Sequence, residues 1–541
     1  MKQSIASLSP AEDEIPAEYR ITEMIRQDYY LIGGELRRWE GPLQEVLSPV
    51  QLQAPGNATP VRKRIGEAPL LSVAAALESL DVAVGAYDNG RGTWPTMSVG
   101  ERIQSVQRFS ASAQKKRGEI VKLLMWEIGK SLQEAEGEFD RAMAYIRDTL
   151  EALKELDRVS SRFVIQHGII GQIRRAPLGV VLCMGPYNFP LYETFTTLIP
   201  ALVMGNTIVL KPPRFGILLF APLLEAFRDS FPPGVVNTVY GDGEEVLPPL
   251  LASGRVDVLG FIGTHKVADA LRAIHPRPHR LRCVLGLDAK NPAIILPDAD
   301  LELTVAECLQ GSLSFNGQRC TALKIIFVHR GMAASFLERM SAGISALKCG
   351  VPWQDGVALT ALPEPEKPDY LEELVRDAGT HGAQVVNEAG GTRSGSFFYP
   401  ALLYPVSPAM RVYSEEQFGP VIPVVPYDDI REAIDYVVAS NYGQQASIFG
   451  RDGDALAQLV DALVNQVCRI NINSKCQRSP DSFPFNGRKN SAEGTQSVAD
   501  ALRIFSIRIV VAARETEDNR EIITGIVRER KSHFLSTDYM L

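Results

Sequence analysis

The sequence lacks the features that mark several whole classes of protein. It has no run near the ~18 apolar residues that a membrane-spanning helix needs, and residues 1–20 contain no apolar core of a signal peptide. Its 7 cysteines are scattered, odd in number and without a CxxC pair, so they form neither a disulfide framework nor a zinc pattern. We therefore expect a cytoplasmic protein with reduced thiols and no metal site.

An excess of positive charge is also absent. The 56 lysines and arginines are outnumbered by 64 acidic residues, which leaves a net charge of −8. This balance argues against nucleic acid or an anionic membrane as a partner and favours a small-molecule substrate. With 541 residues, 45% of them hydrophobic, the chain is long enough for two or three packed units.

The hydrophobic pattern predicts an α/β protein. Residues 1–70 look peripheral, with one strand at 29–32, and residues 70–155 are helical in spacing. Strands then alternate with helices, which predicts βαβ units, a parallel sheet and ligands at the strand C-terminal ends. The predicted strands are 180–184, 207–210, 235–240, 256–262, 292–296 and 324–328; the predicted helices are 192–204, 217–231, 267–274, 301–313 and 332–347.

One cysteine lies on a sharp turn after a predicted helix. The helical spacing of 301–313 ends before the turn dipeptide Asn316-Gly317, and Arg319-Cys320 follows. A thiol on such a turn can face a cleft, and the neighbouring arginine favours the thiolate, which is the nucleophilic form. Cys320 is therefore a candidate nucleophile, and its alternative is an ordinary core cysteine.

Polar residues follow the first two strands of the alternating region. The amide of Asn188, with a backbone N–H, suits a carbonyl oxyanion, unless the side chain only caps its turn. Lys211 and Arg214 suit a phosphate or ribose, or else belong to a solvated loop. Gly241-Asp242-Gly243 lacks the third glycine of a dinucleotide fingerprint, and Glu415-Glu416 by itself is typical of a solvated turn.

Taken in order, these segments resemble the aldehyde dehydrogenase superfamily over roughly residues 80–510. The matching runs are PYNFP at 186–190, GNTIVLKPP at 205–213, FNGQRCTA at 315–322 and EEQFGPV at 415–421. Within the superfamily, GQRCTALK, KPPRFG and the RSPDSFPF run at 478–485 look most like the non-phosphorylating, NADP-dependent glyceraldehyde-3-phosphate dehydrogenases.

The resemblance implies the chemistry. Cys320 would attack the aldehyde carbon, Asn188 and the backbone N–H of Cys320 would hold the oxyanion, and hydride transfer to a nicotinamide would leave a thioester. Arg141, Arg319 and Arg478 stand where the glyceraldehyde-phosphate branch binds phosphate, so the implied reaction is oxidation of glyceraldehyde 3-phosphate to 3-phosphoglycerate. Each arginine could instead pair with a local carboxylate, Arg141 with Asp140 first.

The resemblance also implies the cofactor. Arg214 stands where NAD-preferring relatives usually have a carboxylate, so NADP is expected, with NAD as the alternative. Lys211 would hold the adenosine ribose, Glu416 the nicotinamide ribose, and Phe418 would pack nearby. The other implied cofactor-binding residues are Tyr187, Gly243, Gly263, Thr264 and Leu287.

The implied fold has a Rossmann-like cofactor domain, an α/β catalytic domain and a small β-arm for oligomerisation. The cofactor domain comprises 1–157 and 179–287, the catalytic domain 288–497, the arm 158–178 and 498–515, and the C-terminal tail 516–541. The arm implies a homodimer or homotetramer.

The sequence departs from the family where the thioester is released. Gly286 stands at the position of the glutamate that serves as base for hydrolysis, and a positioned base contributes ~100- to 10,000-fold. Three interpretations stay open. Asp288, Glu416 or Glu193 acts through a water; coenzyme A or phosphate accepts the acyl group; or catalysis is impaired and the chain is a binding or structural partner. Leu247, in place of a glycine, and Thr264, in place of a serine, are further departures.

Overall fold

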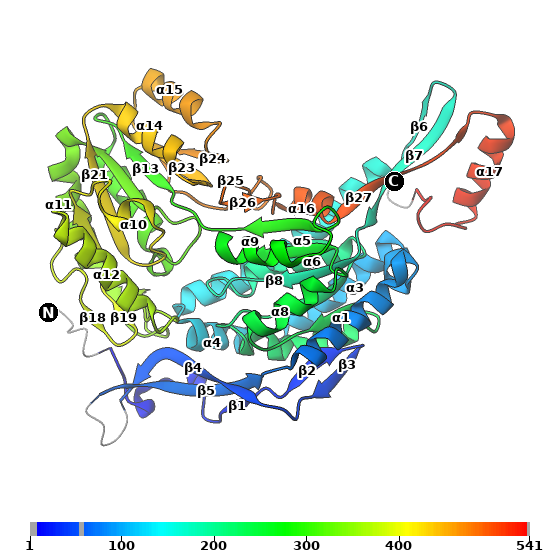
Figure 1. Ribbon diagram of the computed structural model, residues 1–541, viewed down its shortest axis with the longest axis horizontal. Helices are drawn as coiled ribbons and strands as arrows, with labels where there is room; N and C mark the ends of the chain where they lie inside the picture. Colours follow the sequence, from blue (N-terminus) through cyan, green and yellow to red (C-terminus); the bar gives the residue numbers. More distant parts are fainter. Residues whose placement is uncertain (1–7, 54–58, 538–541) are drawn as a thin grey trace.

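The computed structural model describes residues 8–53 and 59–537 and has the predicted α/β architecture, with two central sheets, a β-arm and an N-terminal sheet (Figure 1). Within these residues, no helix is long and apolar enough to cross a membrane. The fold class predicted from the sequence is confirmed.

The first sheet has the strand order β10-β9-β8-β11-β12-β26, and all its pairs are parallel except β12 with β26. Its strands are β8 (Val180–Met184), β9 (Thr207–Lys211), β10 (Val236–Thr238), β11 (Val258–Ile262), β12 (Arg282–Gly286) and β26 (Ala492–Glu493). Such strands are apolar throughout because helices cover both faces of a parallel sheet.

The two faces of β8 belong to different hydrophobic clusters. Val181 and Cys183 pack with one set of helices, and Val180, Leu182 and Met184 pack with the other. The first set includes α3 (Val99–Gln114), α4 (Arg117–Ile128), α5 (Leu132–Ser160), α6 (Tyr192–Val203) and α16 (Val498–Ile504). The second set is α1 (Val73–Tyr87), α8 (Gly243–Ala252) and α9 (His265–Ile274).

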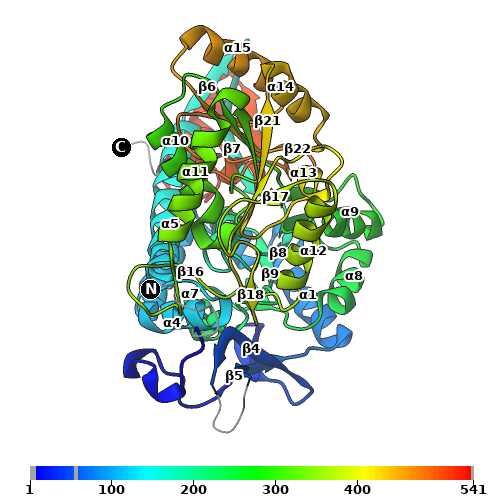
Figure 2. The same ribbon diagram turned by 90° about the vertical axis from the view of Figure 1, so that its left-hand side faces the viewer.

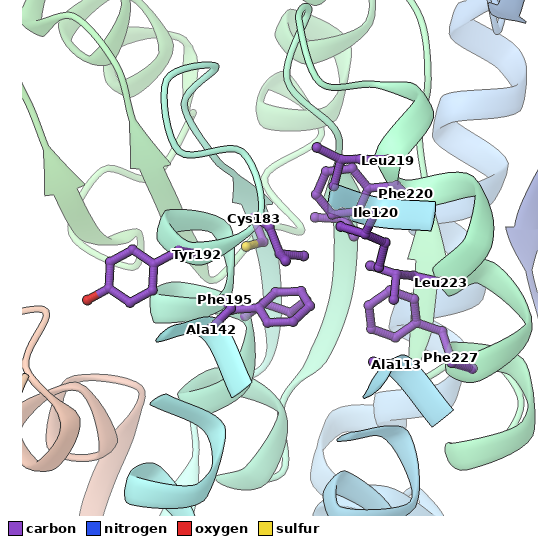
Figure 3. Packing of buried hydrophobic residues seen from close by; sticks show 14 of the residues in the cluster. Ala113, Ile120, Ala142, Cys183, Tyr192, Phe195, Leu219, Phe220, Leu223 and Phe227 are labelled. Carbon is purple, nitrogen blue, oxygen red and sulfur yellow. The ribbon is translucent and has the colours of Figure 1, made fainter. Parts of the chain in front are cut away.

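Helix α6 carries aromatic residues in two directions. Phe195 joins the core with Ile120, Leu219 and Phe227, whereas Tyr192 points its ring away from that group (Figure 3). The Tyr192 hydroxyl donates to Asp481 at 2.5 Å. The first turn of α6 is therefore available to line a site, because the packing residues that anchor the helix lie further along it.

The second sheet has the order β17-β20-β21-β14-β13-β23-β24. Its strands are β13 (Pro292–Ile295), β14 (Ile325–His329), β17 (Gln384–Val385), β20 (Ala401–Tyr404), β21 (Val421–Tyr427), β23 (Gln445–Phe449) and β24 (Arg469–Ile472). Helices α10 (Leu301–Leu313) and α11 (Arg330–Ala346) cover one face; α12 (Lys367–Thr380), α14 (Ile430–Ala439) and α15 (Gly453–Leu463) cover the other (Figure 2).

A β-arm protrudes from the first sheet (Figure 1). It consists of β6 (Phe163–Gln166), β7 (Ile169–Pro177) and β27 (Ser506–Arg514), and α17 (Glu517–Arg528) follows β27. The chain after α17 returns to the arm, where Gln172 and Arg174 donate to the carbonyl of Ser536 at 2.9 and 3.2 Å. The division of the chain into the four segments predicted above stays a prediction.

Two local predictions were wrong. Residues 1–70 hold five strands rather than one: β1 (Ile25–Arg26), β2 (Tyr29–Ile32), β3 (Glu35–Arg38), β4 (Leu43–Leu52) and β5 (Val61–Pro69). Strands β4 and β5 pair at the bottom of the molecule (Figure 2). The sequence pattern concealed them because Pro49 is normally a strand breaker and β5 carries charged residues.

The helix predicted at 217–231 is a 3₁₀ segment, Leu218–Leu223, followed by α7 (Leu224–Ser230), since Pro222 cannot donate a helical hydrogen bond.

The remaining elements are short. They are α2 (Thr93–Thr96), α13 (Arg411–Ser414), β15 (Lys348–Cys349), β16 (Val357–Leu359), β18 (Arg393–Ser394), β19 (Phe397–Phe398), β22 (Tyr442–Gly443), β25 (Arg488–Lys489), and 3₁₀ turns at Glu12–Glu14, Ala17–Tyr19, Asp88–Gly90 and Ser314–Gly317.

Candidate active site

Cys320 lies just beyond a strained turn at the end of α10. Phe315, Asn316 and Gly317 have φ angles of 47°, 54° and 72°, in the left-handed region that favours glycine. A Cβ on Gly317 would lie 2.7 Å from the carbonyl oxygen of Ser312, so a larger residue would disrupt this turn. The carbonyl of Cys320 accepts hydrogen bonds from Asn291 at 2.8 Å and Lys324 at 3.2 Å. The turn is thus held on both sides of the cysteine.

Two cavities meet at this cysteine. One, of about 700 Å³, is lined by α5, the start of α6 and the segment around Arg478; we call it the substrate-side cavity. The other, of about 980 Å³, lies at the C-terminal ends of β8, β9, β11 and β12; we call it the cofactor-side cavity. Within the described part of the chain, Glu193 and Cys320 are the residues that line both.

Burial outweighs the nearby cations in its effect on the half-buried Cys320 thiol, with which the Arg319 guanidinium also interacts electrostatically. Burial raises the pKa of Cys320 to about 11, the charge of Glu193 adds to that effect, and Lys324 and Arg478 oppose it. The guanidinium of Arg319 donates to the Thr321 hydroxyl at 3.1 Å and to the Cys476 carbonyl at 3.5 Å. The sequence pointed to Arg319 and did not reveal that Lys324 and Arg478 also act on the thiol.

Asn188 is directed at the cysteine turn rather than at its own turn. It is 5% exposed, and its Nδ2 donates to the carbonyl of Gln318 at 2.8 Å. Because an amide nitrogen carries two hydrogens, one stays available to an oxygen bound near Cys320. This geometry suits the predicted oxyanion role, and it differs from the turn-capping alternative.

The cofactor-side cavity contains most of the residues predicted to bind the cofactor. Those that line it are Tyr187, Lys211, Arg214, Gly263, Thr264, Leu287, Glu416 and Phe418. Gly243 does not: it begins α8 behind Leu247, and a Cβ there would lie 3.4 Å from the Leu247 side chain and 3.6 Å from Cε of Lys211. Leu247 itself lines the cavity, so its side chain takes up space at the cavity wall that a glycine would leave open.

The cations of the cofactor-side cavity differ in their pairing, and Lys367 pairs with Glu364 at 3.2 Å. Within residues 8–53 and 59–537, neither Lys211 nor Arg214 forms an ion pair with a carboxylate. Burial lowers the pKa of Lys211 to about 8, and the charge of Asp242 opposes that effect. Arg214 is exposed, with its guanidinium 5.2 Å from the Phe215 ring centroid. Free cations beside a cavity of this size suit an anionic ligand.

Glu416 is not on a solvated turn, as its local sequence alone indicated. Its side chain is 12% exposed, pairs with the buried Lys324 and accepts the Ala289 N–H at 3.1 Å. Burial raises the pKa of Glu416, and the Lys324 charge opposes the shift. Next to it, Phe418 adopts a φ of 45° and meets Tyr187 edge-on at 6.0 Å, which forms an aromatic wall.

Two of the three predicted phosphate-binding arginines in the substrate-side cavity are already paired with carboxylates. Arg141 donates to both oxygens of Asp481, at 3.1 and 2.6 Å, and Arg478 pairs with Glu193. The alternative pairing of Arg141 with Asp140 is wrong, because Arg117 takes Asp140 at 2.8 Å. Arg319, bound to a hydroxyl and a carbonyl, is the arginine of this set without a carboxylate partner among the described residues.

Two buried glutamates that no motif indicated position the site. Glu127 accepts the N–H groups of Ile217 and Leu218, at 2.5 and 3.2 Å, and so holds the chain that follows Arg214. Glu138 accepts the N–H groups of Leu191 and Tyr192, at 3.0 and 3.1 Å, at the start of α6. A carboxylate on a helix face gives no local signal of such a distant partner, so the sequence did not reveal either role.

Gly286 ends β12 beside an unpartnered amide. A Cβ built on it would lie 3.2 Å from Nε2 and 3.3 Å from Oε1 of Gln496. Both of these atoms are buried, and neither has a hydrogen-bond partner within the described residues. The Gln496 amide therefore occupies the space in which a longer side chain at position 286 would begin.

The fold and this arrangement agree with comparison to known proteins. The sequence matches the aldehyde dehydrogenase family over residues 54–510, and the chain belongs to this family. It is 30% identical over 444 residues to NADP-dependent glyceraldehyde-3-phosphate dehydrogenase of Pisum sativum, covering 80% of this chain and 87% of the relative. It is 28% identical over 424 residues to 3-sulfolactaldehyde dehydrogenase of Priestia aryabhattai, covering 77% and 87%.

A solved structure shares the whole architecture. The NADP-dependent glyceraldehyde-3-phosphate dehydrogenase from Bacillus halodurans C-125, complexed with NADP, superposes with a TM-score of 0.82 at 30% identity and covers 91% of this chain and 100% of that one. The family resemblance inferred from the motifs is thus confirmed, and the protein is an aldehyde-oxidising oxidoreductase by class.

Proposed function

We propose that this protein oxidises glyceraldehyde 3-phosphate to 3-phosphoglycerate with NADP, through a thioester on Cys320. The observation that carries the proposal is the position of Cys320 at the junction of two cavities, one with arginines for an anionic aldehyde and one with free cations for a cofactor phosphate. The similarity to the NADP-dependent enzymes of Pisum sativum and Bacillus halodurans supports both ligands.

The cofactor-side cavity fits NADP by its donor set. Arg214 is placed to receive the 2′-phosphate, Lys211 the adenosine ribose, and Glu416 the nicotinamide ribose. Gly263, Thr264 and Leu287 supply the wall between them. When bound, NADP supplies the acceptor for the hydride that leaves the aldehyde carbon.

The chain's own residues perform the remaining steps. Cys320 Sγ attacks the aldehyde carbon once its proton is lost, a step that the charges of Lys324 and Arg478 assist. Asn188 and the backbone N–H of Cys320 donate to the oxygen of the tetrahedral adduct. Arg319, with Arg141 and Arg478 in support, binds the substrate phosphate within the substrate-side cavity, which all three arginines line.

A second substrate class is favoured by one observation. Because Arg141 and Arg478 already have carboxylate partners, a dianionic phosphate must compete with Asp481 and Glu193. An aldehyde with a sulfonate or hydroxyl group has less charge to place and needs fewer free cations. The 28% identity to 3-sulfolactaldehyde dehydrogenase points to the same class.

Steady-state kinetics test the proposal. We expect kcat/KM to be highest for glyceraldehyde 3-phosphate with NADP, lower for 3-sulfolactaldehyde, and lowest for uncharged lactaldehyde. A higher value for either of the other aldehydes would replace the proposed substrate. Acceleration by coenzyme A or phosphate would identify acyl transfer rather than hydrolysis, and inactivity with every aldehyde would favour a binding role.

The β-arm supports a proposal about assembly. Its exposed apolar residues are Val164, Ile165, Ile169, Ile507, Ile509, Val510 and Val511. Such a strip is typical of a surface that another subunit covers. We propose a homodimer or homotetramer that the arm joins, which light scattering would measure.

A further inference from the structure

We propose that Glu193 is the general base that releases the acyl group from Cys320, in place of the glutamate that is absent at Gly286. The inference rests on the thioester of the proposed function but not on the identity of the aldehyde or cofactor. It assigns hydrolysis to a residue outside the segment in which the family's base is expected.

The position of Glu193 carries the proposal. It shares with Cys320 the lining of both cavities, and its charge acts on the Cys320 thiol, so its carboxylate lies near the sulfur that would carry the acyl group. Glu193 is 7% exposed and lies in the first turn of α6. Glu138 anchors that turn through the N–H groups of Leu191 and Tyr192. A base needs such a fixed position, because proton transfer requires hydrogen-bond reach of the attacking water.

The ion pair with Arg478 orients this carboxylate. Arg478 is 6% exposed and donates through Nη1 to Oε2 of Glu193, and through Nη2 to the Gln496 carbonyl at 2.8 Å. Within the described residues, Oε1 of Glu193 receives no hydrogen bond, so it remains available to a water. Arg478 therefore acts as a positioning residue for Glu193 in addition to any contact with the substrate.

The other two carboxylates considered for this role each have one oxygen engaged, as Glu193 does, but they differ from it in position. Oδ2 of Asp288 accepts the backbone N–H of His265 at 2.6 Å and contacts its ring Nδ1 at 2.7 Å. Oε1 of Glu416 accepts the Ala289 N–H and pairs with Lys324. Both residues line the cofactor-side cavity alone. Neither has the access to both cavities that Glu193 shares with Cys320.

The hydrolysis step needs only a water, Glu193 and the groups around Cys320. A water proton moves to Oε1 of Glu193 while the water oxygen bonds to the acyl carbon. The carbonyl oxygen becomes an oxyanion held by Asn188 and the backbone N–H of Cys320. The adduct collapses, the C–S bond breaks, and the thiolate of Cys320 leaves; the carboxylic acid product and the proton on Glu193 then pass to solvent.

A test without cofactor uses p-nitrophenyl acetate, which acetylates a reactive cysteine and reports acylation by its coloured leaving group. In the Glu193→Gln variant we expect a burst of about one p-nitrophenolate per subunit, followed by steady-state release roughly 100-fold slower than in the wild type. Intact-protein mass should show the acetyl group accumulating on the variant. The burst itself shows that the variant is folded at the site.

Two further measurements separate a base from a merely structural residue. Hydroxylamine, a nucleophile that does not need the base, should restore turnover of Glu193→Gln to near the wild-type rate. Gly286→Glu added to Glu193→Gln should also recover part of the steady-state rate, since only the flexible Gln496 amide must move. Glu225→Gln, which changes a glutamate in the first turn of α7 outside both cavities, is the matched control, and its steady-state rate should equal that of the wild type.

The outcomes distinguish the two proposals. A normal burst with an unchanged steady-state rate in Glu193→Gln overturns the role of Glu193 and leaves Cys320 as the nucleophile. A slow steady state in Asp288→Asn instead of Glu193→Gln moves the base to Asp288. Absence of acetylation at Cys320 in the wild-type protein would contradict the proposed thioester, and with it the base.

Discussion

The two cavities that meet at Cys320 differ in whether their predicted ligand-binding cations already have carboxylate partners. In the cofactor-side cavity, Lys211 and Arg214 have no carboxylate partner among the described residues. In the substrate-side cavity, Arg141 and Arg478 are tied to Asp481 and Glu193. A ligand phosphate on the first side gains free cations, whereas one on the second side must displace carboxylates or share their partners.

This difference separates binding from chemistry. The free cations have a single use, which is to hold an anionic ligand. The paired cations hold Asp481 and Glu193, and under the two proposals above Arg478 would both bind the substrate and orient Glu193. Removing a free cation should therefore change affinity alone, and removing a paired one should also disturb a buried carboxylate.

The largest effect is expected for Cys320, the residue at which the two cavities meet. Cys320→Ala should lower kcat for aldehyde oxidation by at least ~10,000-fold, because no other nucleophile replaces the sulfur. The Kd for NADP, measured by fluorescence titration, should change less than about threefold, since the cations of the cofactor-side cavity are untouched. If Cys320→Ala loses less than ~10,000-fold in kcat, the reaction does not pass through this cysteine.

The second-largest effect is expected for Arg214, the unpaired cation beside the Phe215 ring. Arg214→Ala should raise the KM for NADP by roughly 10- to 100-fold, the loss of a charged hydrogen bond of about 1.5–3 kcal/mol. The KM for NAD, which has no 2′-phosphate, should stay the same, and this cofactor provides the internal control. Equal losses with both cofactors would mean that Arg214 does not distinguish them.

A smaller effect, on the KM for the aldehyde, should distinguish the arginines of the substrate-side cavity from one another. Arg319→Ala should raise the KM for glyceraldehyde 3-phosphate by about tenfold, and Arg141→Ala by about threefold, because Arg319 has no carboxylate to release. The matched comparison is the KM for lactaldehyde, which should be unaffected by Arg319→Ala. The reverse order of the two variants would show that the ion pair with Asp481 opens when substrate binds.

The smallest effect concerns stability rather than turnover. Burial raises the pKa of Glu127 to about 7, and its hydrogen bonds to backbone N–H groups oppose the shift. The folded-state pKa of Glu127 lies above its unfolded-state pKa. The contribution of protonated Glu127 to the free energy of unfolding is therefore highest below about pH 4.3, and it is lost as the pH rises to about 7. Glu127→Gln should therefore gain stability relative to the wild type above pH 7, by up to roughly 3 kcal/mol.

Thermal unfolding of both proteins at pH 5 and pH 8 measures this difference. The Tm of Glu127→Gln minus that of the wild type should be larger at pH 8. A difference independent of pH would show that Glu127 is ionised in the folded protein throughout this range.

The alternating strands were predictable because a parallel sheet covered on both faces requires continuous apolar strands with helices between them. The turn before Cys320 was equally visible, since Asn316-Gly317 marks a left-handed bend. The N-terminal sheet was missed because Pro49 interrupts the pattern of β4 and charged residues interrupt that of β5, the central strand in the order β1-β5-β4.

What the sequence could not predict were contacts between distant residues. Arg478 and Glu193 are 285 positions apart, and Arg141 and Asp481 are 340 apart. No local pattern states that these charges neutralise each other. For the same reason the wrong partner, Asp140, was the natural one to assign to Arg141, and the action of Lys324 and Arg478 on the Cys320 thiol was not predicted.

The most direct measurement is a single turnover of the purified protein with excess glyceraldehyde 3-phosphate and NADP, followed by NADPH absorbance. The account predicts a burst of about one NADPH per subunit, with the acyl group recovered on Cys320 by mass spectrometry after acid quench. No burst and no modified cysteine, under conditions in which NADP binds, would contradict it.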